Sequence, residues 1–339
     1  MNIKSLNRKL NKKFAGRVTA RLSDGCIVLT GELDDWNDVV DAGMTAATPH
    51  SSTHVVNDIV FTGAAEEKMH MPAIDDKALD GEKPDVLVIG GGISGCSVAR
   101  ELSRYKLSVL LIDKEADLAL GASGRNDGEV HPGVDLSKGS LKHKYIRRAN
   151  HMYEDLCREL DVPFKRTGQY ACFTHKSWLP FVSLYAKWRR DHDGIEDTCI
   201  VMGDEIRKKE PKISADVAFA LSNPSSGSVS PYNLVIAYAE NAVQNGARVS
   251  LNTAVTGMDV SGGEIKAVYT NRGTIYPREV INCAGVYSDV VAQMAQDRFF
   301  SIHPRRGTNS ILDKKTGASF HGIASIVMSQ SPVQTHTKG

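Results

Sequence analysis

Three glycines, Gly90, Gly92 and Gly95, stand at the spacing G-x-G-x-x-G. They follow residues 85–89, a short apolar run typical of a buried parallel strand, and precede residues 93–105, which have helical periodicity. Gly90 permits a tight turn out of the strand, and Gly92 lets the backbone approach a pyrophosphate. Gly95 lets the helix pack closely on the strand. The spacing and its context therefore predict a site for the phosphates of a dinucleotide.

The residues around these glycines also fit a dinucleotide. The helix would begin near Ile93 and Ser94, and the free N–H groups at its N-terminus would point at the phosphates. A second apolar run, residues 107–112, ends at Asp113, which Lys114 follows. A carboxylate at this position accepts hydrogen bonds from the adenosine ribose. The alternative, a glycine-rich turn without a ligand, is disfavoured because strand, helix, second strand and acid are all present.

Size and composition are those of an ordinary globular protein. The chain has 339 residues, enough for two or three domains, of which 41% are hydrophobic and 24% charged. Its net charge of +1 creates no general attraction to nucleic acid, so we expect no nucleic-acid partner. No stretch is long and apolar enough to predict a transmembrane helix, and contact with a membrane surface stays open.

The cysteines give no sign of a metal site. None forms a C-x-x-C pair or a zinc-like spacing with histidine, so we expect no bound metal. Most of them stand among apolar residues, which favours small core residues in a reducing, cytoplasmic compartment. The six are Cys26, Cys96, Cys157, Cys172, Cys199 and Cys283.

The N-terminal part has a pattern of its own. It predicts strands at residues 18–22, 26–29 and 54–61 and a helix at residues 34–47. This layout, with the stretches DGCIVLTGEL and VVNDIVF, resembles a BON domain, a small α+β module linked to binding at surfaces or to other domains. A structural appendage without a ligand is the alternative. Residues 64–84 are polar, contain proline and glycine, and are predicted to be a linker.

Further elements are predicted after the glycine-rich unit. The periodic patterns indicate helices at 141–160, 178–188, 231–245 and 286–294, strands at 248–251 and 279–282, and a β-meander at 257–280.

Several motifs together separate FAD from NAD, which the glycines alone do not. Six stretches carry this signal, in the order VLVIGGGISGCSVARELS, GASGRNDGEVHPG, LDVPFKRTGQY, SVSPYNLVIAYAENAVQNGARVSLNTAVTGM, VINCAGVYSD and PRRGTNSILDK. This series resembles the D-amino-acid oxidase superfamily of FAD-dependent oxidoreductases. Within it, FAD-dependent glycerol-3-phosphate dehydrogenases and L-2-hydroxyglutarate oxidases are the most similar branch. The resemblance extends from about residue 84 to the end.

The resemblance implies FAD as the cofactor and a role for each matching residue. Gly90, Gly92 and Gly95 would hold the pyrophosphate, and Asp113 the ribose. The other implied cofactor contacts are Ser123 and Arg125 along the phosphates and flavin, Ala284 and Gly285 near the adenosine or pyrophosphate, and Asn126 and His131 near the isoalloxazine. The implied fold is α/β: a Rossmann-type FAD-binding domain with an inserted α+β substrate domain, preceded by the BON-like module. The expected parts are 1–63 (BON-like), 64–84 (linker), 85–160 with 225–297 (FAD-binding) and 161–224 with 298–339 (substrate domain).

His131, Arg305 and Arg306 are the candidates for catalysis. A substrate hydroxyl needs a base, and the pKa of an unperturbed histidine lies near neutrality. A structural histidine, or one bonded covalently to FAD as in some members of the superfamily, is the alternative. Arg305 and Arg306 would bind an anionic substrate, since a guanidinium binds two oxygens of a carboxylate or phosphate at once. The alternative is that one of these arginines forms a structural ion pair and the other is a surface charge.

These residues predict an FAD-dependent oxidoreductase that transfers a hydride from a small anionic alcohol to flavin, with a separate, unidentified electron acceptor. A glycerol-3-phosphate dehydrogenase-like activity is expected first. The alternatives are an L-2-hydroxyglutarate or amino-acid oxidase, a non-catalytic FAD-binding fragment, and the less favoured nicotinamide-dependent dehydrogenase. The sequence near residue 339 resembles the middle of a domain. We therefore expect a truncated chain with an incomplete active site, which binds FAD weakly or does not turn over.

Overall fold

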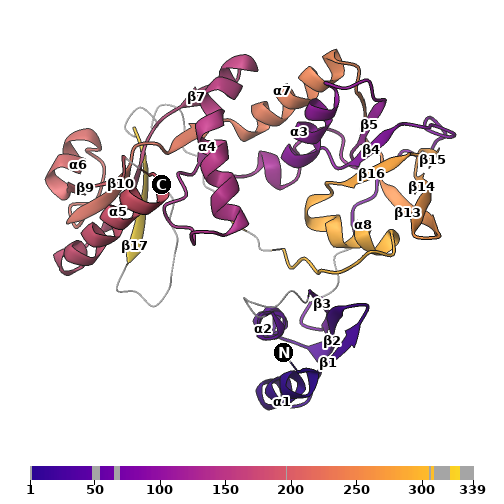
Figure 1. Ribbon diagram of the computed structural model, residues 1–339, viewed down its shortest axis with the longest axis horizontal. Coiled ribbons are helices and arrows are strands. Elements are labelled where there is room, and N and C mark those ends of the chain that lie inside the picture. The colour runs from indigo at the N-terminus through magenta and orange to yellow at the C-terminus, as the bar shows by residue number, and fades with distance from the viewer. Residues whose placement is uncertain are drawn as a thin grey trace. The chain divides into compact units, whose positions relative to one another are not determined.

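The structure is a computed structural model that describes residues 2–47, 54–64, 69–195, 197–304, 307–308 and 321–328. The chain divides into two compact units (Figure 1). The first comprises Met1–Gly124 and Tyr238–Gly307, and the second comprises Arg125–Ala237 and Thr308–Gly339. We describe each unit by itself.

The first unit begins with a small α+β module. Its elements are α1 (Ile3–Phe14), β1 (Val18–Ser23), β2 (Cys26–Leu33), α2 (Trp36–Ala46) and β3 (Val55–Phe61). β2 lies in the middle of the sheet, antiparallel to β1 and parallel to β3. The three predicted strands and α2 are confirmed. α1 was not predicted; it buries Leu6, Leu10 and Phe14 in the core of the module.

A four-stranded parallel sheet forms the centre of the remaining first unit. The strands lie in the order β12-β5-β4-β16, so that two segments far apart in the sequence flank β4. Their bounds are β4 (Val86–Ile89), β5 (Val109–Ile112), β12 (Arg248–Ser250) and β16 (Glu279–Asn282). β4 and β5 are buried along their whole length, as their apolar runs predict. α3 (Ile93–Leu102) packs on both of them (Figure 1).

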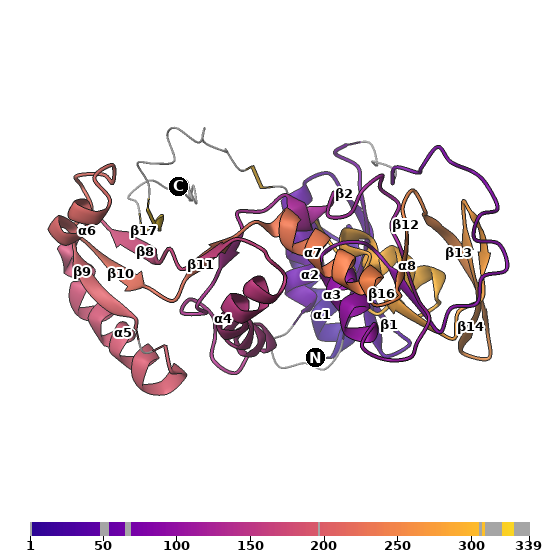
Figure 2. The ribbon, with the colours of Figure 1, turned by 90° about the horizontal axis from the view of Figure 1, so that it is seen from above.

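A β-meander and two short helical segments complete the first unit. The meander is antiparallel and consists of β13 (Val255–Ser261), β14 (Glu264–Thr270) and β15 (Gly273–Ile275), with β13 beside β14 in Figure 2. α8 (Ser288–Met294) follows β16, and α7 (Pro231–Gln244) runs across the boundary between the units. Asp76 donates its N–H to Asn271 and Gly81 donates its N–H to Thr274, so residues 76–81 follow the edge of the meander.

The second unit contains two sheets. The larger has the order β17-β8-β10-β9 and the smaller the order β6-β11-β7. Their strands are β6 (Glu129–Val130), β7 (Phe164–Lys165), β8 (Gln169–Phe173), β9 (Cys199–Met202), β10 (Phe219–Asn223), β11 (Gly227–Val229) and β17 (Ile323–Met328). The helices are α4 (Leu141–Glu159), α5 (Leu179–Asp193) and α6 (Gly203–Lys209). α5 covers one face of the larger sheet, where Val182 and Ala186 pack against Phe173 and Phe219.

These elements confirm the predicted mixed α/β class. In the described part of the chain, no helix combines the length and apolar character needed to cross a membrane. Burial and the nearby carboxylate of Asp113 raise the pKa of Cys96, on α3, to about 12. This thiol therefore stays protonated at neutral pH and acts as a small core residue.

Candidate functional site

The turn after β4 fits so closely against the neighbouring strand that it requires glycine. Gly90 has φ of +111°, a conformation that side chains rarely adopt. A Cβ at Gly90 would lie 2.2 Å from the carbonyl oxygen of Cys283, just after β16. A Cβ at Gly95 would lie 1.8 Å from the carbonyl oxygen of Gly90, so α3 packs directly on this turn. The predicted roles of these two glycines are therefore visible in the backbone.

The N-terminus of α3 is arranged to receive an anion. Gly92 is the N-cap and provides no side chain to the first N–H groups of the helix. The N–H of Ile93 donates to Oγ of Ser123 at 2.9 Å, and a Cβ on Gly92 would meet the same Oγ at 2.9 Å. Helix N–H groups, the positive dipole end and a hydroxyl thus lie together at a position without a Cβ. Ser94 lies next along this first turn.

The carboxylate of Asp113 lies beside the glycine turn. Its Oδ2 accepts the N–H of Gly91 at 2.5 Å, and its Oδ1 accepts the N–H of Glu115 at 2.8 Å. Two backbone donors therefore fix the side chain at the carboxyl end of β5. Each carboxylate oxygen can accept a further hydrogen bond, as binding a ribose hydroxyl requires.

The segment after β16 borders the same turn. The Cα of Ala284 would lie 3.1 Å from a Cβ on Gly90, and Gly285 has φ of +58° with open space around it. The ammonium of Lys114 pairs with Glu115 and lies 5.3 Å from the ring centroid of Tyr287. The first unit thus brings together the predicted glycines, Asp113, Lys114, Ser123 and Ala284. Glycine-rich backbone, exposed helix donors and a fixed carboxylate fit the pyrophosphate and ribose of FAD.

We predict that Ser123→Ala weakens the binding of FAD by about 10-fold or more, because a hydroxyl bonded to a charged phosphate contributes about 1.5–3 kcal/mol. Quenching of flavin fluorescence during titration measures the dissociation constant. Ser97→Ala is the control for the loss of a hydroxyl, since the Ser97 hydroxyl, on α3, donates to the carbonyl of Ser94 at 3.0 Å. Equal affinity of the Ser123 variant and the wild type would contradict the assignment of Ser123.

The second unit holds the other predicted residues. Arg125 and Asn126 are exposed, and Oδ1 of Asn126 accepts the N–H of Gly128 at 2.9 Å. His131 follows β6, and its side chain is 32% exposed. The contacts of Arg125, Asn126 and His131 with flavin stay predictions. Arg305 and Arg306 lie outside the described residues.

His131 is held by a buried carboxylate that the sequence did not single out. Its Nδ1 lies 3.3 Å from Oε1 of Glu129, whose side chain is 1% exposed. The same Oε1 accepts a hydrogen bond of 2.8 Å from Nε2 of Gln169. Alternate residues of a strand share a face, and this is the one sequence signal that connects Glu129 with His131. Gln169 belongs to another strand and has no such signal.

A buried asparagine fixes the backbone at His131. Asn150, on α4, is 3% exposed, and its Nδ2 donates to the carbonyls of His131 at 2.9 Å and Ser225 at 3.1 Å. Its Oδ1 accepts from Nη1 of Arg166 at 3.0 Å. Arg166 also donates to the carbonyls of Ser225 and Asn150. The histidine is therefore fixed through both its main chain and its side chain.

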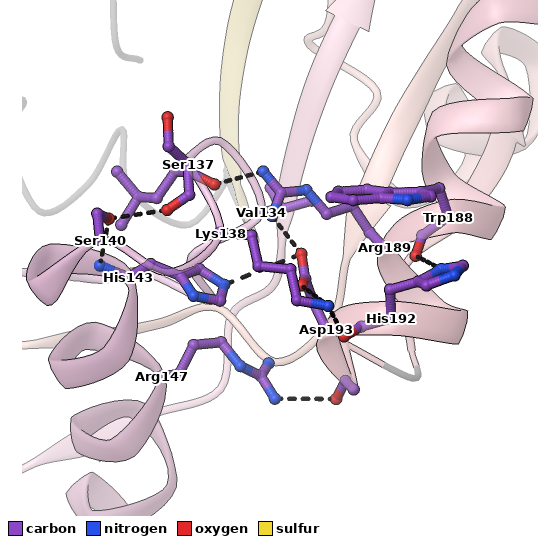
Figure 3. Close-up of polar contacts among 12 residues, drawn as sticks. Val134, Ser137, Lys138, Ser140, His143, Arg147, Trp188, Arg189, His192 and Asp193 are labelled. Atoms are coloured by element: carbon purple, nitrogen blue, oxygen red, sulfur yellow. Dashed lines mark hydrogen bonds and ion pairs between the residues drawn. The ribbon is translucent and has the colours of Figure 1, made fainter. Parts of the chain in front are cut away.

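The loop after His131 is anchored by a buried ionic cluster on α5 (Figure 3). Arg189, 4% exposed, pairs with Asp193, whose side chain is fully buried, and also donates to the carbonyl of Leu136. Lys138 lies 3.5 Å and His143 3.9 Å from the Asp193 carboxylate. The cluster thus joins the loop and α4 to the end of α5.

The comparisons with known proteins agree with this geometry. Residues 85–335 match the family model of FAD-dependent oxidoreductases. A glycerol 3-phosphate dehydrogenase of Caloramator mitchellensis is 36% identical over 69% of this chain and 48% of its own length. An L-2-hydroxyglutarate dehydrogenase of Indibacter alkaliphilus is 33% identical over 66% of this chain and 56% of its own length.

Solved structures show the same fold. An L-α-glycerophosphate oxidase of Mycoplasma pneumoniae, solved with FAD bound, has a TM-score of 0.60 at 23% identity over 72% of this chain and 65% of that one. A glycine oxidase of Bacillus cereus has a TM-score of 0.56 at 24% identity, covering 62% of this chain and 59% of that one. This chain spans about half the length of the curated relatives it matches. With the family model matching most of the chain, and with the glycine turn, Asp113 and Ser123 in place, this chain belongs to the FAD-dependent oxidoreductase family.

Proposed function

We propose that this chain is the flavin-binding part of a dehydrogenase that oxidises a small anionic alcohol, in the manner of a glycerol-3-phosphate dehydrogenase. The observation that carries the proposal is His131, an imidazole that is partly exposed while its backbone and Nδ1 side are held by buried groups. A fixed and partly exposed histidine suits the removal of a hydroxyl proton. The similarity to the Caloramator enzyme supports the same substrate class.

In the proposed reaction the alcohol becomes a ketone. The glycine turn would hold FAD, which when bound would supply the acceptor for the hydride and its two electrons from the substrate carbon. His131 accepts the hydroxyl proton, and Asn150 keeps the histidine backbone in place. Arg305 and Arg306 are proposed to bind the anionic group of the substrate, since both oxygens of a carboxylate or phosphate fit a guanidinium.

A related activity on an L-2-hydroxy acid is the second candidate. It is favoured by the 33% identity to the Indibacter enzyme, and it needs the same base and the same cation. An amino-acid oxidase and a non-catalytic FAD-binding fragment remain outcomes of the test below. The proposal includes a separate electron acceptor, in solution or at a membrane surface.

The three-part organisation belongs to the proposal as well. The strand order and the position of α2 support a BON-like fold for the N-terminal module. The remaining boundaries are those expected from the sequence, with an FAD-binding domain at 85–160 and 225–297 and a substrate domain at 161–224 and 298–339.

The absorption spectrum of the purified chain, with and without added FAD, is the first test. We expect the bands of oxidised flavin, and their loss under anaerobic conditions when glycerol 3-phosphate is added. L-2-hydroxyglutarate and a panel of amino acids are tested in parallel. Acid precipitation then separates free flavin from flavin bonded to the protein.

The outcomes distinguish the candidates. Bleaching by glycerol 3-phosphate supports the first candidate, and bleaching by L-2-hydroxyglutarate alone favours the second. Bound flavin that none of these compounds reduces would exclude both and favour a non-catalytic fragment. Flavin that stays with the precipitate would support the covalent alternative for His131.

A further inference from the structure

The position of the imidazole ring of His131 is set from within the second unit. β6 pairs with β11, with Val130 opposite Gly227 and Glu129 opposite Ser228, and β11 also pairs with β7. Glu129 and His131 are two positions apart on this chain segment, so their side chains lie on the same side. The backbone of β6 therefore places the Glu129 carboxylate beside the His131 imidazole.

The carboxylate of Glu129 requires hydrogen-bond donors because it is almost fully buried. A buried carboxylate without partners is strongly destabilising. Gln169 provides one donor through Nε2 at 2.8 Å, and Nδ1 of His131 lies 3.3 Å from the same oxygen. An ionised carboxylate only accepts hydrogen bonds, so Nδ1 must carry a proton to interact favourably with it.

A chain of polar groups, two of them fully buried, continues from Glu129 through Gln169. Oε1 of Gln169 accepts from Nδ2 of Asn223 at 3.3 Å, and Oδ1 of Asn223 accepts from the hydroxyl of Thr198 at 2.9 Å. Asn223 and Thr198 are fully buried, and Asn223 lies opposite Gln169 in the pairing of β10 with β8. Each amide must turn its nitrogen toward Glu129, because that end of the chain only accepts.

We infer that Glu129 is a positioning residue, which holds His131 in the tautomer with the proton on Nδ1, so that Nε2 accepts the hydroxyl proton of the substrate. Thr198, Asn223 and Gln169 hold Glu129 in turn. The inference rests on the proposed function for its chemical step. In that step the substrate O–H bond breaks, an Nε2–H bond forms, and the hydride leaves the same substrate carbon for FAD.

The arrangement also stabilises the state that follows. Once Nε2 has accepted the proton, the imidazolium carries a positive charge next to the Glu129 carboxylate. A buried carboxylate behind a catalytic histidine orients the ring and stabilises this cation. Orientation and charge are separate contributions, and they can be measured separately.

Two substitutions at position 129 separate the contributions. Glu129→Gln keeps a side-chain oxygen that accepts from Nδ1 but removes the charge, whereas Glu129→Leu removes both. We expect the Nδ1–H tautomer to persist in Glu129→Gln and to be lost in Glu129→Leu. We expect kcat to fall about 10-fold in the first and about 100-fold in the second, with little change in KM, because a general base contributes about 100- to 10,000-fold.

The tautomer is measured on the FAD-loaded chain by long-range proton–nitrogen correlation of labelled histidines. The His131 signal is assigned by its loss in His131→Asn. Glu210→Gln is the matched control, since Glu210 is also a buried carboxylate of this unit but accepts from the backbone of His321. It should leave the His131 signal unchanged. If Glu129→Leu does not fold, Gln169→Leu replaces it as the variant that weakens the hold on Glu129.

The nitrogen spectra and the kinetics each test whether Glu129 positions His131. A proton on Nε2 in the wild type, or an unchanged tautomer in the variant lacking the carboxylate, would overturn it. So would a wild-type kcat in both position-129 variants. If no substrate reduces the flavin, the proposed function fails, and the nitrogen spectra alone still show whether Glu129 sets the tautomer.

Discussion

Replacement of Gly95 by alanine is expected to abolish the binding of FAD. The new Cβ would lie 1.8 Å from the carbonyl oxygen of Gly90 and 3.4 Å from Cβ of Cys283. The nearest contact is a backbone oxygen, which cannot relieve the clash by changing rotamer as a side chain could. Helix α3 must therefore move away from β4. Overpacking of this kind also destabilises a protein by about 1–3 kcal/mol. Flavin fluorescence titration and thermal unfolding measure the two effects.

The control for this substitution is Gly121→Ala. A Cβ at Gly121 meets no atom within 4 Å, so the same chemical change is made in open space. We expect this variant to bind FAD as the wild type does. If Gly95→Ala bound FAD with wild-type affinity, the turn between β4 and α3 would not be the pyrophosphate site.

Replacement of Arg189 by methionine is expected to lower the free energy of unfolding by about 3–5 kcal/mol, because it leaves a buried carboxylate without its main partner. Among the described residues, Asp193 would keep the pairs with Lys138 at 3.5 Å and His143 at 3.9 Å. The double substitution Arg189→Met with Asp193→Leu is expected to recover much of the loss, since a well-packed apolar pair replaces the ionic one. Urea unfolding at neutral pH measures both variants.

The contribution of Asp193 to the free energy of unfolding depends on pH in a defined direction. Burial by itself raises the pKa of Asp193, but the hydrogen bond and charge of Arg189, with the charge of His143, hold this pKa below its ordinary value. A lowered pKa stabilises the folded state above the ordinary aspartate range, and this contribution is lost as pH falls through the folded-state pKa. In Arg189→Met, burial prevails and the carboxyl group takes up a proton more easily. The stability gap between the variant and the wild type should therefore narrow in acid.

An exposed ion pair provides the control. Arg158 pairs with Asp155 on the surface of α4, where both side chains are more than 70% exposed. Arg158→Met should change the free energy of unfolding by less than about 1 kcal/mol. A similar loss of unfolding free energy in the Arg158 and Arg189 variants would contradict the importance of burial. A stability difference between Arg189→Met and the wild type that grows in acid would contradict the predicted pH dependence.

The cofactor site was predictable because its signal is local. Gly90, Gly92 and Gly95 lie within six residues, and the backbone geometry they permit follows from their lack of a side chain. Asp113 was predictable from the end of an apolar strand. The support of His131 was not, because Asn150 bonds its carbonyl and Gln169 bonds Glu129 through tertiary packing. No spacing in the sequence reports such a contact.

Helix α1 shows how composition can hide a pattern. Leu6, Leu10 and Phe14 recur every four residues and are buried, but five lysine and arginine side chains lie close to them in a short basic stretch. No helix was predicted from that stretch. Residues 76–81, which follow the edge of the meander, bury a single apolar side chain, Leu79. One buried residue gives no periodic pattern from which this packing could be predicted.

The order of strands in the parallel sheet has a consequence for biosynthesis. β4 leaves the ribosome early, but its neighbour β16 lies far along the chain; the flanking pair Asp85 and Arg278 are 193 positions apart. Closing so long a loop is slow compared with local folding. The nascent chain therefore displays an unpaired edge of β4 until β16 has been made. Capture of the flavin follows the pairing of β16 with β4, and free FAD should raise the yield of refolded protein when it is present from the start.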